Sequence, residues 1–330
     1  MLRDWNIEHV PLAGESAVRN LRYNGADENF SRRRGQDGAM IQRFVFHNER
    51  LLPIEQVRLS PGQSGLLNGW GLFTTLRIVE GVPFAFERHW ARLSRDARRT
   101  QCPFPFESEA VLASLLEVLR ANQVQEGCAR IYVVHNLAGH WRSDEKLPAA
   151  DLLICSAGLP PYRDPVRLAI REHGRHAASP LAGVKVTSWL DNVWSLQQAH
   201  QAGWDEVILL NERGEIAECT AANIFCVFGG QVVTPPLSSG CLEGVTRSVL
   251  LEVGPAAGVP IEERTLFPED INSADEVFVS STNRNVIAAS EVAGHAIPAV
   301  PGPVMQKLER ALSACVREYV EARAAVSGRR

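Results

Sequence analysis

The chain has 330 residues, enough for two domains of ordinary size. Hydrophobic residues make up 45% and charged residues 22%, a globular composition that excludes wholesale disorder. The net charge of −4 gives no electrostatic reason to bind nucleic acid, and no apolar run approaches the roughly 20 residues of a membrane helix. Without a hydrophobic signal segment or a CxxC pair among seven cysteines, we expect a cytoplasmic location.

The first part of the chain predicts an irregular start followed by strands. Residues 1–39 alternate small, polar and charged residues without periodicity, so we expect a poorly ordered N-terminal extension there. A strand, a turn and a short return strand follow from Met40. The segments 72–79 and 82–86 predict a hairpin that turns at Glu80-Gly81.

Two helices and two further strands are expected next. Apolar residues recur at helical spacing over 87–99 and again after Ser108, which we expect to cap the second helix. The segments 129–136 and 150–157 predict strands. Three prolines and a glycine in 156–165 indicate an interdomain loop.

The remainder of the chain has its own succession of elements. We expect Asp191 to cap a helix that runs to Gly203. The further expected elements are two hairpins over 206–220 and 223–234, a helix from Gly244, a strand over 275–281 and a C-terminal helix from residue 302. The sequence therefore predicts a smaller N-terminal α/β domain over 40–155 and a larger C-terminal α/β domain over 166–330.

Lysine is scarce in this chain. Of 34 basic residues, only Lys146, Lys185 and Lys307 are lysines. Lys146 and Lys307 stand among polar residues, whereas Lys185 lies in LAGVKVTSW, among small and apolar ones. A lysine removed from water can lose its proton and form a Schiff base, which an arginine cannot. Lys185 is therefore a candidate for amine chemistry, with a solvated ammonium at a strand edge as the alternative interpretation.

Amine chemistry through an aldehyde cofactor needs an acid near a ring nitrogen and a site for a phosphate. Glu218 lies in AECTAANIF, an apolar setting that is unusual for a carboxylate without a partner. Gly244-Val245-Thr246 opens a helix after a loop, which suits an anion, and Arg92 lies one position off a helix's apolar stripe. Taken alone, Glu218 also fits a strand-end glutamate that faces water, and Gly244-Val245-Thr246 an ordinary helix start. Arg92 also fits a surface ion pair.

Motifs for other chemistries are absent from the sequence. It has no GxGxxG after a strand and no GxxxxGK[ST], GxSxG or HExxH. The nine histidines show no metal-ligand spacing, and His173 and His176 lie three apart in a basic loop by chance. We therefore expect no metal site.

Six blocks, in order, resemble the class IV aminotransferase family, the fold-type IV enzymes that use pyridoxal 5′-phosphate. They are NGWGLFTTLR, HWARL, AGVKVTSWLDN, GWDEVILLNERGEIAECTAANIF, TPP with GCLEGVTR, and DEVFVSST. The resemblance runs from about Met40 to Tyr319. It implies two α/β domains with the active site between them, a pyridoxal 5′-phosphate cofactor and a homodimer.

The resemblance also implies roles for individual residues. Lys185 is similar to the Schiff-base lysine that holds the aldehyde and then moves the substrate Cα proton, and Glu218 to the carboxylate beside the pyridine nitrogen. The residues similar to the family's phosphate contacts are Arg92, Val245, Thr246 and Thr282. Trp189 stands where relatives often place a tyrosine beside the cofactor, so the bulk of a ring is kept and a hydroxyl is lost.

Two reactions of the family remain open. Phe73-Thr74-Thr75 and ECTAANIF resemble the 4-amino-4-deoxychorismate lyase branch, in which Thr75 would lie near the substrate and assist proton transfer. For either reaction, we expect Phe73, Thr75 and Asn283 to face the substrate. Lyase relatives typically have Arg-Gly where this chain has Asn136-Leu137, although Arg142 or Arg284 could replace that arginine. The segment PGPVMQKL is more similar to transaminases. We predict an aminotransferase that acts on an amino acid and a 2-oxo acid, in the manner of branched-chain aminotransferases. The lyase, which releases pyruvate and 4-aminobenzoate, is the alternative, and a non-catalytic pyridoxal 5′-phosphate-binding protein is a third.

Overall fold

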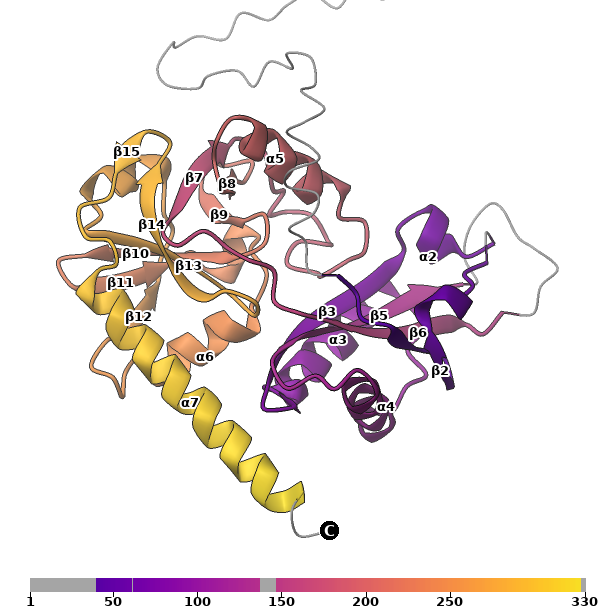
Figure 1. The fold of residues 1–330 in the computed structure, drawn as a ribbon. Coiled ribbons are helices and arrows are strands. Elements are labelled where there is room, and N and C mark those ends of the chain that lie inside the picture. The colour runs from indigo at the N-terminus through magenta and orange to yellow at the C-terminus, as the bar shows by residue number, and fades with distance from the viewer. Residues whose placement is uncertain (1–39, 61, 137–146, 328–330) are drawn as a thin grey trace, which may run out of the picture.

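A computed structural model describes residues 40–60, 62–136 and 147–327. Its strands form two sheets, which we name the N-terminal sheet and the C-terminal sheet and which lie side by side in Figure 1. Helices pack on both, so the structure mixes α and β elements as the sequence predicts. The predictions for residues 1–39 and for Arg142 lie outside the described residues.

The N-terminal sheet is antiparallel throughout, in the order β2-β1-β6-β5-β3-β4. Its strands are β1 (Phe44–His47), β2 (Arg50–Pro53), β3 (Gly71–Val79), β4 (Val82–Pro83), β5 (Gly127–His135) and β6 (Ala150–Ala157). Glu80 and Gly81 have φ angles of 51° and 74°, so the predicted hairpin turns through two left-handed residues.

The helices of this part are η1 (Ile54–Gln56), α2 (Ser64–Leu67), α3 (Phe86–Thr100) and α4 (Ser108–Ala121). Leu93 of α3 and Leu115 of α4 are buried in one apolar core with Leu72 and Ile131 of the sheet. α3 also buries a second stripe, formed by the polar side chains of His89, Arg92 and Asp96. That stripe lies beside the apolar one on α3, and its Arg92 lines the site described below.

The C-terminal sheet has the order β12-β11-β10-β13-β14-β7-β8-β9, with β15 paired to β14. Its strands are β7 (Val166–Arg171), β8 (Glu206–Leu210), β9 (Ile216–Cys219), β10 (Asn223–Phe228), β11 (Gln231–Thr234), β12 (Ile261–Glu263), β13 (Glu276–Ser281), β14 (Asn285–Val292) and β15 (His295–Ala296). The pairs β11–β12, β14–β7 and β7–β8 are parallel and the others are antiparallel.

The helices of this part are α5 (Leu190–Gln201), η2 (Leu237–Ser239), α6 (Val245–Val253), η3 (Pro268–Ser273) and α7 (Pro303–Ser327). α6 and α7 pack side by side against β13 and β14 (Figure 1). The predicted stripe of α7 is buried at Leu308 and Leu312, in a core that also contains Phe84 from the end of β4. The two sheets therefore share apolar contacts through α7.

Two helix caps differ from the prediction. Ser108 is the first residue of α4, and Glu107 stands at its cap position. Trp189 stands at the cap position of α5, while Asp191 lies in its first turn and pairs with Arg171 at 2.9 Å. Both predictions of a capping side chain are wrong by one or two residues, because a polar residue in the first turn gives the same sequence signal as one at the cap. Within the residues described, no helix is long and apolar enough to cross a membrane.

Candidate active site

Every site residue predicted from the sequence lines one cavity of about 520 Å³. The predicted residues on it are Phe73, Thr75, Arg92, Lys185, Trp189, Glu218, Val245, Thr246, Thr282 and Asn283. They come from strands and helices of both sheets and from the loops between them. The geometry thus brings together residues that are more than 200 positions apart in the chain.

The backbone of Lys185 is held by the N-terminal sheet and its helix. Its carbonyl accepts a hydrogen bond from the N–H of Phe73 at 3.1 Å, and its own N–H donates to Asp96 Oδ2 at 3.2 Å. Gly183, two residues earlier, has a φ of +70°, and a Cβ there would lie 2.9 Å from the carbonyl oxygen of Cys241. This position therefore favours glycine, which lets the chain turn into the cavity.

The Lys185 side chain lies in a setting that removes its proton near neutrality. Burial lowers the pKa of Lys185 from 10.5 to about 7, with a further lowering by the charge of Arg92 that Glu218 opposes. Its Nζ lies 4.6 Å from the centre of the Phe73 ring and 5.5 Å from that of Trp189. A lysine with this pKa has a large neutral, nucleophilic fraction at pH 7.

An anion site is formed where α6 begins. Val245 and Thr246 are the first helical residues, so their N–H groups have no partner within the helix. Arg92 reaches this end of the cavity, where its Nη1 donates to the carbonyl of Glu243 at 3.2 Å. Thr282, just after β13, lines the same region. A guanidinium, helix N–H groups and threonine hydroxyls together are a suitable set for a phosphate.

Arg92 is oriented by two residues that the sequence analysis did not select. Its Nη2 donates to Thr74 Oγ1 at 2.9 Å, and the same hydroxyl is hydrogen-bonded to His89 Nδ1 at 2.8 Å. Burial, followed by the charges of Arg92 and Lys185, lowers the pKa of His89 well below 6.5. A neutral His89 can accept a hydrogen bond from the Thr74 hydroxyl. The hydroxyl oxygen is then free to accept a hydrogen bond from Arg92.

Glu218 is buried, and each of its two carboxylate oxygens accepts a hydrogen bond. One carboxylate oxygen accepts from Arg175 Nε at 2.9 Å and the other from the N–H of Leu242 at 3.1 Å. Arg175 in turn donates to Asn192 Oδ1 at 3.1 Å. The carboxylate is thereby fixed in orientation at the cavity wall, which suits a group that must face one atom of a ligand.

Three residues of β3 and β5 form another wall of the cavity. Phe73 lies opposite Tyr132 and Thr75 opposite Arg130, in the register of β3 with β5. Phe73, Thr75 and Arg130 all line the cavity, because alternate residues of a strand point to the same face. Among the residues described, Arg130 has a hydrogen bond to the Tyr132 hydroxyl at 3.1 Å and no carboxylate partner.

A second arginine of the cavity wall is neutralised. Arg284 pairs with Glu206 at 2.6 Å, with both side chains buried, and its guanidinium lies 4.6 Å from the Tyr162 ring centre. Asn283, its neighbour, has a buried Oδ1 atom without a hydrogen-bond partner in the described structure. Asn136, where lyase relatives place an arginine, does not line the cavity and donates instead to Asp151 Oδ1 at 2.9 Å.

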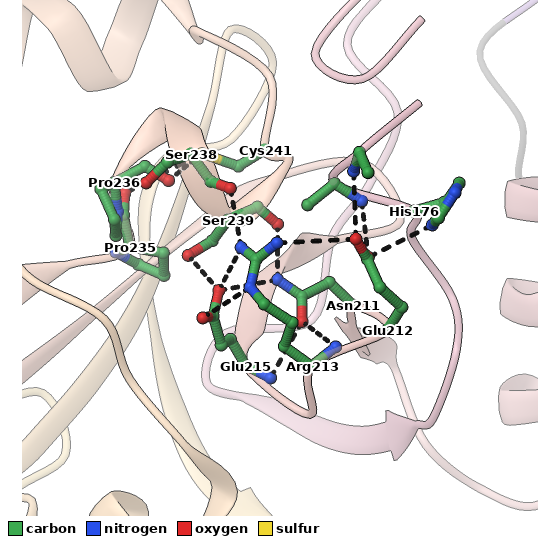
Figure 2. Close-up of polar contacts among 12 residues, drawn as sticks. His176, Asn211, Glu212, Arg213, Glu215, Pro235, Pro236, Ser238, Ser239 and Cys241 are labelled. Atoms are coloured by element: carbon green, nitrogen blue, oxygen red, sulfur yellow. Dashed lines mark hydrogen bonds and ion pairs between the residues drawn. The ribbon is translucent and has the colours of Figure 1, made fainter. Parts of the chain in front are cut away.

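The turn between β8 and β9 ties together two loops that lead into the site (Figure 2). Glu212 accepts from the N–H groups of Ala177 and Ala178 at 2.7 and 3.1 Å. Arg213 Nη2 donates to the carbonyl of Ser238 at 2.8 Å, and Asn211 Nδ2 to that of Ser239 at 3.1 Å. The first loop precedes Lys185 and the second precedes α6, so one turn connects the approaches to both ends of the cavity.

Comparison with known proteins places the chain in a family. The family described as "Amino-transferase class IV" matches residues 71–292, so the chain belongs to the class IV aminotransferases and the predicted resemblance is confirmed. A putative branched-chain-amino-acid aminotransferase of Methanocaldococcus jannaschii is 28% identical over 77% of this chain and 89% of its own length. A D-alanine aminotransferase of Bacillus licheniformis is 26% identical over 81% and 95%, and an aminodeoxychorismate lyase of Bacillus subtilis is 26% identical over 75% and 86%.

Solved structures share the fold. The branched-chain aminotransferase of Thermoproteus uzoniensis with norvaline is 27% identical and has a TM-score of 0.76. The superposition covers 84% of this chain and 95% of that one. A branched-chain amino acid aminotransferase from T.th. with pyridoxamine 5′-phosphate is 24% identical, with the same TM-score of 0.76 and coverage of 83% of this chain and 94% of its own. These likenesses confirm the predicted fold-type IV architecture.

Proposed function

We propose that this chain is a pyridoxal 5′-phosphate-dependent aminotransferase that transfers an amino group between an amino acid and a 2-oxo acid. The observation that carries the proposal is the amine of Lys185, whose burial lowers its pKa to about 7 in a cavity that also contains an anion site. A phosphorylated aldehyde requires two attachment points. The nucleophilic amine binds its aldehyde, and the anion site binds its phosphate.

The residues present fit this cofactor. Arg92, the N–H groups of Val245 and Thr246 and the hydroxyl of Thr282 would hold the phosphate. Glu218, fixed by Arg175, would face the ring nitrogen. When bound, the cofactor would supply an aldehyde for exchange of amines and a ring that accepts electrons from the substrate Cα.

The residues of the chain would perform the remaining steps. Lys185 Nζ would bond the aldehyde, yield it to the substrate amine and then take the proton from the substrate Cα as general base. The carboxylate of Glu218 would keep a proton on the ring nitrogen by pairing with it. The Phe73 and Trp189 rings near Nζ would exclude water from the amine.

Arg130 supports a substrate that carries a carboxylate. It lines the cavity opposite Thr75, and in the described structure no carboxylate neutralises it. A cavity guanidinium without an acidic partner favours an anionic ligand group, since Arg and carboxylate form charge-assisted hydrogen bonds. We therefore propose amino acids, rather than simple amines, as the amino donors.

The 4-amino-4-deoxychorismate lyase remains the second candidate. One observation favours it: Thr75 lies on the cavity face, where a hydroxyl would assist proton transfer. Against it, Asn136 is bonded to Asp151 and does not line the cavity, so no arginine acts from that position. A purely cofactor-binding role is disfavoured because Lys185 and Glu218 are both present.

The visible absorbance spectrum of the purified protein with pyridoxal 5′-phosphate tests the proposal. L-Glutamate, D-alanine and L-leucine are added separately, without any acceptor. We expect at least one to convert the band of lysine-bound cofactor into that of the amine form. A band that persists with all three, together with release of pyruvate and 4-aminobenzoate from 4-amino-4-deoxychorismate, would overturn the transaminase in favour of the lyase.

Three organisational predictions remain proposals. Homodimerisation is supported by exposed apolar side chains on α5, at Leu190, Val193 and Trp194, and a monomer by light scattering would contradict it. The division into domains 40–155 and 166–330, joined by 156–165, is tested by limited proteolysis at the joining loop. A cytoplasmic location is tested by cell fractionation.

A further inference from the structure

A buried carboxylate that is not assigned to the cofactor or the substrate lies behind the part of the cavity that contains Lys185. Asp96 of α3 is 1% exposed, and its Oδ2 accepts from the N–H of Lys185 at 3.2 Å. Its Oδ1 accepts from Arg95 Nη2 at 3.2 Å. A carboxylate at this depth is costly unless its partners are fixed, so these contacts hold their donors in place.

Arg95 extends this contact to the other end of the cavity. Its Nη1 is bonded to the carboxylate of Glu243, the residue two positions before α6. Arg92, one turn earlier on α3, donates to the carbonyl of the same Glu243 at 3.2 Å. α3 therefore contacts both the segment that carries Lys185 and the segment that begins the anion site.

We propose that Asp96 and Arg95 are positioning residues that form a clip, in which Asp96 fixes the backbone of Lys185 and Arg95 fixes Glu243. The clip sets the separation between the amine that bonds the aldehyde and the helix start that binds the phosphate. This inference rests on the proposed function, because it assumes a ligand attached at both ends. Its physical basis is that two attachment points reinforce each other only when their separation matches the ligand.

The clip predicts a specific binding signature. Pyridoxal 5′-phosphate uses both attachment points, whereas pyridoxal uses the amine alone. The ratio of the pyridoxal dissociation constant to that of pyridoxal 5′-phosphate thus measures how well the two ends are matched. Loss of overall stability weakens both ligands alike and leaves this ratio unchanged, which separates positioning from a merely structural role.

To test this, the full chain without cofactor is titrated with each compound, and the visible band of the lysine-bound ligand is followed. We expect the ratio to fall about tenfold in Asp96→Ala, from loss of a buried hydrogen bond to a charged group. Asp96→Asn, which keeps an acceptor oxygen, and Arg95→Gln should each lower it about threefold.

Two matched controls are available in the same part of the molecule. Arg88 also lies on α3 and pairs with Glu252 of α6 at 2.5 Å, but neither residue lines the cavity. Asp151 is equally buried, yet it accepts from Asn48, Asn136 and His47 away from the site. Arg88→Gln and Asp151→Asn should lower the melting temperature at most and keep the ratio within about twofold.

An unchanged ratio in Asp96→Ala overturns the clip while leaving the proposed function intact. If that variant does not fold, an unchanged ratio in both Asp96→Asn and Arg95→Gln has the same meaning. If the unmodified chain forms no visible band with pyridoxal 5′-phosphate, the proposed function itself fails. The two failures are therefore distinguishable in a single series of titrations.

Discussion

The two walls of the cavity are constructed differently. On the C-terminal side, Glu218, Val245 and Thr282 stand at the ends of elements, where backbone N–H groups and loops meet. On the N-terminal side, Phe73, Thr75 and Arg130 stand in the middle of two long strands and face the cavity through their register. Lys185 belongs to the later half of the sequence, but β3 and α3 hold its backbone.

This difference separates two tasks. Element ends present fixed backbone groups, which suit the constant parts of a cofactor, namely its phosphate and ring nitrogen. Side chains on strand faces change without disturbing the backbone, and they suit the variable part of a substrate. We call the C-terminal side the first wall and the N-terminal side the second wall. Substitutions on the first wall should therefore abolish chemistry, and those on the second wall should change the affinity for substrates.

The largest effect is expected at the amine itself. Lys185→Ala removes both the nucleophile and the general base, so we expect kcat to fall by at least about 10⁴-fold. The visible band of lysine-bound cofactor should be absent as well. Lys307→Ala, at a residue of α7 outside the cavity, is the matched control and should retain normal turnover. Turnover that survives in Lys185→Ala would refute the role assigned to this lysine.

A smaller effect is expected at Glu218, the buried carboxylate of the first wall. Glu218→Gln keeps the acceptor for Leu242 N–H but removes the charge that faces Arg175. We expect kcat to fall about 10²–10³-fold, as when a preorganised electrostatic partner is removed from an active site. Glu215→Gln, in the same hairpin and paired with Arg213 outside the cavity, is the control. Equal kcat values for the two variants would contradict the assignment of Glu218.

The sequence was sufficient to predict the first wall but only part of the second. Glu218 stands out by its apolar neighbours, and Val245 and Thr246 by following a glycine at a helix start, so local signals mark all three. The predictions of Thr282, Phe73 and Thr75 rest on the resemblance alone. Arg130 was missed because β5 looks like any alternating strand, and its position opposite Thr75 depends on a register that no local pattern specifies.

Buried polar partners were missed for a similar reason. Asp96 was missed because it lies four residues after Arg92 on α3, a spacing typical of a solvated helix face. They are buried only because the 181–186 segment and Glu243 pack across them. Arg175 lies in a basic loop whose sequence carries no recognisable motif, although it fixes Glu218. Long-range packing decides these contacts, whereas strand and helix positions follow from periodicity within each segment.

The second wall is tested by comparing Arg130 with Arg284, a cavity arginine that lies between β13 and β14 on the first wall. Arg130→Gln should weaken binding of the dicarboxylate glutarate about 10- to 100-fold, because it removes a cavity charge that has no acidic partner in the part of the chain that the structure describes. Its melting temperature should change little. Arg284→Gln leaves the buried Glu206 carboxylate without its counter-charge, so it should instead lower stability by about 3–5 kcal/mol. Glutarate affinity is measured by perturbation of the visible band and stability by thermal unfolding. Unchanged glutarate binding in Arg130→Gln would exclude this arginine from substrate recognition.

The smallest expected effect concerns the pH at which the Lys185 amine becomes reactive. Burial and the charge of Arg92 lower the pKa of Lys185 to about 7, so its amine is protonated and unreactive below that pH and neutral above it. Glu218 opposes this lowering, while Arg130 and Arg175 add to it, so every wall of the cavity contributes. The rate at which the apo chain captures pyridoxal 5′-phosphate should rise about tenfold between pH 6 and pH 8 and then level off. An ordinary lysine, such as Nα-acetyl-lysine in solution, should continue to gain reactivity up to about pH 10. Stopped-flow absorbance measures both rates, and a capture rate that keeps rising beyond pH 9 would show that the cavity leaves the amine unperturbed.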